Sequence, residues 1–134
     1  MRGLTNDEAA AVERSAGEPM LAQVEAWAAV NSGSHNLPGL DRIAGLLADS
    51  FAALPGETVL REAAPVDSVT PSGQRLAVKH GRNLHLAVRP EAPVQLLFTG
   101  HMDTVFAADH AFQKTSWLED GVLGGPGVAD MKGG

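Results

Sequence analysis

The chain has 134 residues, of which 44% are hydrophobic and 19% are charged, values that suit one globular domain. Its formal net charge of −6 argues against nucleic-acid binding, which requires a basic surface, and the absence of cysteine excludes a disulfide framework and a thiolate metal site. No apolar stretch predicts a secretory signal or a membrane span, so the cytoplasm is the expected location and no membrane partner is expected.

The first part of the sequence predicts three helices. Thr5 or Asn6 is placed to cap a helix that continues to about residue 15, and Gly-Glu-Pro at 17–19 separates it from a second helix that ends near residue 30. Pro38 suits the first turn of a third helix, which ends at Pro-Gly, residues 55–56. In that helix apolar residues recur every three or four positions, which predicts a face packed on the core: Leu40, Ile43, Leu47, Phe51 and Leu54.

The middle of the chain predicts β-strands at residues 59–62, 75–80, 84–88 and 94–98. Gly-Arg-Asn at 81–83 favours a hairpin between the second and third of these, and the Pro-, Ser- and Gly-rich segment 65–73 favours a surface loop. Residues 94–98 are apolar throughout except for Gln95, which is typical of a central strand buried on both faces of an α/β sheet. A further hairpin is predicted at 117–122, with Asp-Gly at its turn.

Three polar residues are predicted to meet at the end of this central strand. His101 follows the strand directly, at the sheet edge where ligands and catalytic groups collect in open α/β sheets. Asp103 lies two positions on and points the same way in an extended chain, so it can accept the second N–H of His101 and turn the other ring nitrogen toward a metal. Asp130 follows a Gly-rich turn and is expected at the same edge, where its carboxylate could bridge two divalent ions.

The two motifs that carry these residues together resemble a known enzyme family. Residues 98–105, Phe-Thr-Gly-His-Met-Asp-Thr-Val, and residues 125–134, Gly-Pro-Gly-Val-Ala-Asp-Met-Lys-Gly-Gly, are similar to the signature stretches of the di-zinc peptidases and deacylases. That family includes glutamate carboxypeptidase, acetylornithine deacetylase, succinyl-diaminopimelate desuccinylase and aminoacylase. The resemblance covers about residues 21–134, and Gly-Pro-Gly-Val favours the glutamate carboxypeptidase branch.

The resemblance implies a fold and a set of site residues. Residues 1–134 would form the N-terminal portion of an α/β catalytic domain, with helices on the faces of a mixed sheet and without the smaller second domain of the family. His101 would bind zinc, Asp103 would be the catalytic-centre residue that orients it, and Asp130 would bridge two zinc ions, with cobalt or manganese as alternative metals. The peptide bond after Asp130 would be cis, as it often is in the family.

The implied reaction is metal-dependent hydrolysis of an amide bond that joins a peptidyl or acyl group to an amino acid. The substrate would be a small peptide or an N-acyl amino acid, and the full-length parent could be a homodimer. The general base and the remaining zinc ligands of the family have no position in this sequence, so the resemblance implies that this polypeptide alone is inactive and binds metal weakly. An N-acyl amino acid deacylase, or a non-catalytic remnant that needs a complementary chain, is the alternative.

The other histidines and one acidic pair favour structural interpretations. His80 and His85 lie in strand-like stretches without an acidic neighbour, His35 lies in a turn-like segment, and His110 suits an exposed loop more than a substrate contact. Glu119 is followed by the Asp-Gly pair of the predicted hairpin turn, and adjacent strand residues point to opposite faces. We therefore do not expect paired catalytic carboxylates there.

Overall fold

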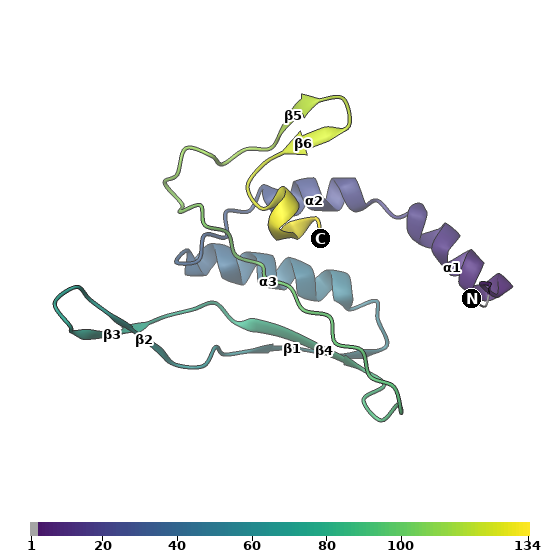
Figure 1. Cartoon of the computed structure of the whole chain (residues 1–134), viewed down its shortest axis with the longest axis horizontal. Helices are drawn as coiled ribbons and strands as arrows, with labels where there is room; N and C mark the ends of the chain where they lie inside the picture. Colours follow the sequence, from purple (N-terminus) through teal and green to yellow (C-terminus); the bar gives the residue numbers. More distant parts are fainter. Residues whose placement is uncertain (1–2) are drawn as a thin grey trace.

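The computed structural model describes residues 3–134, and it contains both helices and strands, as predicted (Figure 1). Three helices come first, and they are followed by six short strands and a π-helical turn. The elements are α1 (Asn6–Ala16), α2 (Met20–Ala28), α3 (Leu37–Phe51), β1 (Gly56–Arg61), β2 (Val66–Val69), β3 (Arg75–Val78), β4 (Asn83–Val88), β5 (Ser116–Glu119), β6 (Val122–Gly124) and η1 (Val128–Lys132). Within residues 3–134, no helix combines the length and the apolarity that crossing a membrane requires.

Helix α1 begins at the predicted cap and stands apart from the other elements. The Thr5 side chain accepts the backbone N–H of Glu8, and the Glu8 carboxylate accepts the backbone N–H of Thr5 at 2.6 Å, which forms a capping box. No residue of α1 is buried, and the helix extends away from α2 at one end of the molecule (Figure 1). Its stability therefore comes from local capping more than from packing.

Helix α3 provides the centre of the small core. Asn36 caps it by accepting the N–H of Gly39, and Leu40, Ile43 and Ala44 are buried. The prediction of a buried apolar face is confirmed for the N-terminal half of α3, where Leu40 and Ile43 are buried. It is wrong at the other end, because the helix ends at Phe51, whose side chain is 40% exposed.

The strands form three separate two-stranded antiparallel sheets. Strand β4 pairs with β1, and this sheet packs against α3, with alternate residues of β4 turned toward the interior (Figure 1). The predicted hairpin between residues 75–80 and 84–88 is wrong, because β3 pairs instead with β2, which lies in the stretch predicted to be a loop. The turn forms at Gly73, whose φ of +83° suits glycine and whose N–H donates to the Thr70 carbonyl, so residues 81–83 connect two different sheets.

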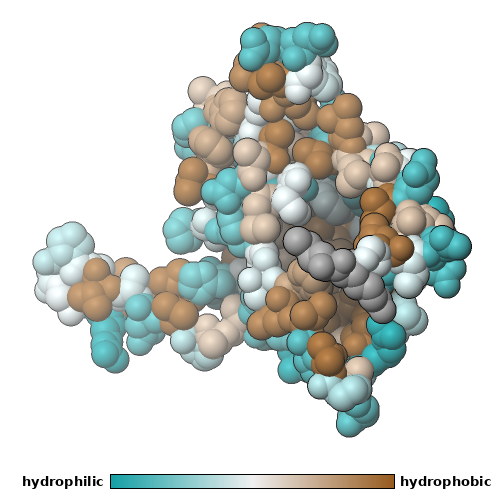
Figure 2. Space-filling model, turned by 45° about the vertical axis from the view of Figure 1, so that its right-hand side comes forward, coloured by the Kyte–Doolittle hydropathy of each residue, from teal (hydrophilic) through white to brown (hydrophobic). Residues whose placement is uncertain are grey.

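The buried central strand predicted at residues 94–98 is absent from the described chain. Its large apolar side chains are 76–88% exposed: Val94, Leu96, Leu97 and Phe98. No strand among residues 3–134 lies alongside it, and no backbone hydrogen bond joins residues 96–101 to another described residue. The α/β content is thus confirmed, whereas the mixed sheet is not present in the described residues. Other apolar side chains also reach the surface (Figure 2).

Three segments far apart in the sequence meet beside α2 and α3. Gly33 forms a parallel bridge with Thr104, and η1 packs against α2 (Figure 1). A Cβ atom at Gly33 would stand 2.5 Å from the carbonyl oxygen of Phe106, so only glycine allows this approach. The junction brings His101 and Asp130 to one place.

Candidate metal site

The loop between α2 and α3 is the support of the candidate site. The Thr104 N–H donates to the Ser32 carbonyl at 2.9 Å, and the Ser34 N–H donates to the Thr104 carbonyl at 3.0 Å. The Asn31 side-chain amide donates to the carbonyls of Phe106 and Ala107, each at 3.2 Å. These bonds fix the segment that contains His101 and Asp103 to the helical part of the molecule, although the backbone of residues 96–101 forms no hydrogen bond to the backbone of another described residue.

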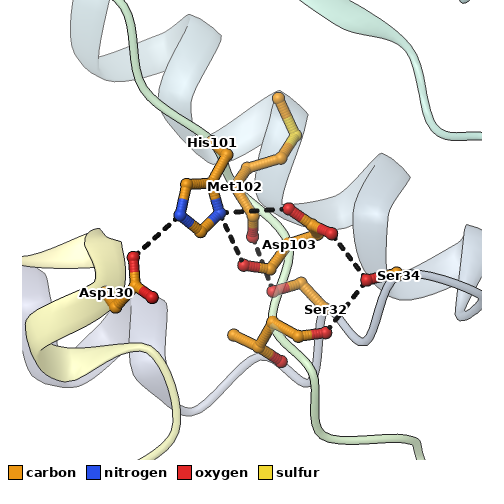
Figure 3. A network of polar contacts seen from close by, with 7 residues as sticks. Ser32, Ser34, His101, Met102, Asp103 and Asp130 are labelled. Carbon is orange, nitrogen blue, oxygen red and sulfur yellow. Dashed lines mark hydrogen bonds and ion pairs between the residues drawn. The ribbon is translucent and has the colours of Figure 1, made fainter.

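The His101 ring is held between two carboxylates (Figure 3). Its Nδ1 lies 3.1 Å from Asp103 Oδ1 and 3.1 Å from the Asp103 carbonyl oxygen. Its Nε2 lies 2.8 Å from Asp130 Oδ1, although Asp130 is 29 positions further along the chain. The structure therefore brings together all three residues that the sequence analysis selected.

Two serines hold the backbone and the carboxylate beside His101 (Figure 3). The Ser34 hydroxyl donates to Asp103 Oδ2 at 2.6 Å, and the fully buried Ser32 hydroxyl donates to the Met102 carbonyl at 2.7 Å. Asp103 thus uses one oxygen for Ser34 and the other for His101. This division fixes the rotation of the carboxylate and, through it, the orientation of the imidazole.

Asp130 is presented by the irregular turn η1. Gly127 precedes the turn with a φ of +76°, and Asp130 itself has an extended backbone with φ −132° and ψ 93°. The Asp130–Met131 peptide bond is cis, as expected from the resemblance. The Asp130 side chain is 87% exposed, so its carboxylate is accessible to a further ligand.

The hydrogen bonds of the site change the proton affinities of its members. The bond to Asp130 is the largest cause that raises the pKa of His101, and the contacts with Asp103 act in the same direction. The Ser34 hydroxyl is the largest cause that lowers the pKa of Asp103, with His101 as a further cause. Burial lowers the pKa of Lys132. A protonated His101 is therefore favoured here, and protons would compete with a metal for Nε2.

The donor atoms suit zinc, but they are too few for a complete catalytic site. Imidazole nitrogen and carboxylate oxygen are both common zinc ligands, and Nε2 is the ring nitrogen that Asp103 leaves available. Among residues 3–134, no group of three or more His, Cys, Asp or Glu side chains is arranged to hold a metal ion. Catalytic zinc generally has three protein ligands, so His101 and Asp130 supply a partial set.

A cavity of about 920 Å³ adjoins the candidate site. His101 and Asp103 line one part of it, and apolar residues of the helices, among them Trp27 and Ile43, line another. Such a combination of an apolar wall and a few polar groups is typical of ligand-binding cavities. The Trp27 side chain is half-buried in this wall, in agreement with a packing role.

The other histidines do not join His101. His85 is exposed on β4 opposite Val59, and His35 is exposed before α3. His80 lines the cavity without a hydrogen bond to the site, and His110 accepts the Phe112 N–H at 3.0 Å. The hairpin prediction at 117–122 is confirmed, because β5 and β6 flank an Asp-Gly turn.

Sequence reasoning missed the residues that support the site, namely Ser32, Ser34, Asn31 and Lys132. Their only sequence signals are their positions in a short polar loop and directly after the Asp130 motif. No family model, curated protein or solved structure matches the chain.

Proposed function

We propose that this chain is part of a zinc-dependent hydrolase that cleaves the amide bond between a peptidyl or acyl group and an amino acid, in the manner of a glutamate carboxypeptidase. The observation that supports the proposal best is the imidazole of His101 held between the carboxylates of Asp103 and Asp130. A carboxylate, a histidine and a metal in series form a common arrangement of zinc sites. The motifs of residues 98–105 and 125–134 give the reaction class.

Each site residue has a defined task under this proposal. Asp103 accepts the Nδ1 proton and leaves Nε2 of His101 for the metal, and the exposed carboxylate of Asp130 supplies a second ligand. Bound zinc would lower the pKa of a water molecule and polarise the scissile carbonyl. We expect weak zinc binding and no hydrolysis by this chain alone. Residues 3–134 offer two ligands and no carboxylate placed as general base, and general base catalysis is worth roughly 10²–10⁴ in rate.

Calorimetric titration of zinc into the purified chain tests the proposal. We expect binding that is lost in His101→Ala and in Asp130→Ala and is retained in His85→Ala, the matched control on the exposed face of β4. Binding that is indifferent to the first two substitutions would contradict the proposal. Hydrolysis of N-acyl amino acids that depends on both zinc and His101 would support the reaction class and would show that the two ligands suffice.

A second candidate is a metal-binding piece that acts only together with a complementary polypeptide. The exposed apolar segment at 94–98 favours it, because its backbone forms no hydrogen bond to another residue of 3–134 and is free to pair with a strand of a second polypeptide. Under this candidate the chain alone gives the same zinc titration. Hydrolysis would appear only after addition of a polypeptide that carries the missing acidic and histidine ligands.

A further inference from the structure

Lys132 is the buried charged residue that the proposed chemistry does not use. Lys132 is only 6% exposed, and its Nζ donates to the Val30 carbonyl at 2.7 Å. Among residues 3–134, no carboxylate forms an ion pair with it. A buried ammonium without a carboxylate partner is unfavourable, so its surroundings must stabilise the charge in another way.

The C-terminal end of α2 supplies that stabilisation. The helix has no basic residue in its last turn, and its C-cap is Ala29. The last carbonyls of a helix have no intrahelical partner and give this end a partial negative charge, which favours a nearby cation. Val30 follows the C-cap directly, so Lys132 brings the missing cation to this end from 102 positions away in the sequence.

The same residue closes the turn that presents Asp130. The Lys132 backbone N–H donates to the Gly127 carbonyl at 2.7 Å, which joins the two ends of η1 around Asp130. A Cβ atom at Gly127 would stand 3.1 Å from Lys132 Cδ, so the lysine stem lies directly against this turn. The backbone of Lys132 thus holds the turn, while its side chain holds the turn to α2.

We propose that Lys132 is a positioning residue, whose ammonium anchors η1 to the C-terminal end of α2 and thereby keeps the Asp130 carboxylate in contact with His101. The loop that begins at Val30 also carries Ser34, which orients Asp103. Lys132 therefore connects the two sides of what we call the His101 clamp, namely the carboxylates of Asp103 and Asp130 that hold the ring between them. The zinc part of the test below depends on the proposed function, whereas the metal-free part does not.

The test compares Lys132→Met, which keeps the length and removes the charge, with Lys132→Arg, which restores a cation. Lys114→Met is the matched control, because Lys114 is exposed. In metal-free protein, the ¹⁵N shifts of the His101 ring are measured at one pH and compared with those of Asp130→Asn. In a second experiment, zinc affinity is measured by calorimetry, and thermal unfolding identifies the temperatures at which each variant is folded.

We expect Lys132→Met to move the His101 ring shifts toward those of Asp130→Asn and to weaken zinc binding about 10-fold, the scale of groups that orient metal ligands. Lys132→Arg should bring the His101 ring shifts and the zinc affinity part of the way back to the wild-type values. Lys114→Met should leave the ring shifts and the zinc affinity unchanged. Ring shifts that match the wild type in folded Lys132→Met overturn the inference, even if its unfolding temperature is lower, because Lys132 is then only structural. Absence of zinc binding in the wild type would contradict the proposed function alone. If Lys132→Met does not fold, Lys132→Gln takes its place under the same criteria.

Discussion

Asp103→Asn is the substitution that best tests how His101 is oriented. The Asp103 carboxylate uses both oxygens as acceptors, Oδ2 for the Ser34 hydroxyl at 2.6 Å and Oδ1 for His101 Nδ1 at 3.1 Å. An asparagine side chain of the same shape has one oxygen and one NH₂ group, and the NH₂ group cannot accept. Asn at this position can keep its oxygen toward His101 Nδ1 only if its NH₂ group faces Ser34, whose hydroxyl must then accept from it and donate instead to the Thr104 carbonyl at 3.2 Å. Asn also lacks the charge that favours the Nδ1–H tautomer of His101.

The expected loss is at the lower end of the range for groups that orient metal ligands. Such substitutions weaken metal binding by about 10- to 100-fold. The Asp103 carbonyl oxygen also lies 3.1 Å from Nδ1 and stays in place, and the Asp103 side chain is 40% exposed. We therefore expect zinc binding to weaken about 10-fold, or about 1.4 kcal/mol. Calorimetry would refute the reasoning if Asp103→Asn bound zinc as tightly as the wild type while His101→Ala did not. Asp109→Asn, which removes the same charge from an exposed neighbour, is the control.

Three further predictions concern proton affinity, the core and the exposed segment. Asp130→Asn should lower the pKa of His101 in an NMR titration, because Asp130 is the largest cause of its elevation. That elevation means that protonated His101 stabilises the fold below its ordinary pKa of 6.5, and that this contribution disappears as the pH rises through the raised value. Ile43→Ala should lower the free energy of unfolding in urea by about 2–5 kcal/mol, since Ile43 is fully buried; a loss near zero would mean that α3 does not organise the core. We expect the chain to self-associate in sedimentation experiments through its exposed apolar segment, and we expect Leu97→Lys to reduce this association, because Leu97 is 88% exposed. A wild-type chain that stays monomeric, or association that Leu97→Lys leaves unchanged, would contradict this prediction.

The helices were predictable because their signals are local. Thr5 and Pro38 mark the beginnings of α1 and α3 in the sequence, and Leu40 and Ile43 mark the buried face. Each signal lies within one or two turns of the residue that it controls, so little depends on distant packing. The end of α3 was less predictable, because the apolar stripe continues beyond the last residue that packs against the core.

The strands were less predictable because a strand needs a partner that the local sequence does not identify. The valines of β2 lie in a stretch with many turn residues, and the turn at Gly73 pairs them with β3. The apolar pattern of 94–98 predicts a buried strand that the structure does not contain, since a strand there depends on neighbouring strands that residues 3–134 do not provide. The apolar pattern of a segment therefore indicates which side chains it can bury, but it does not identify the strands or helices that pack on them.

The geometry of the site depends less on a mixed sheet around residues 94–98 than the sequence analysis predicted. The prediction placed His101 at the end of a central strand, so that the strand itself would fix the histidine. In the structure residues 94–98 form no strand and have no backbone hydrogen bond to another residue of 3–134. His101 is held instead by Asp103 and Asp130, and the serines of the loop after α2 hold the Asp103 segment. The polar loop and the buried Lys132 are thus the elements that preorganise the site, and substitutions that change the exposed segment at residue 97 should leave the His101 clamp in place.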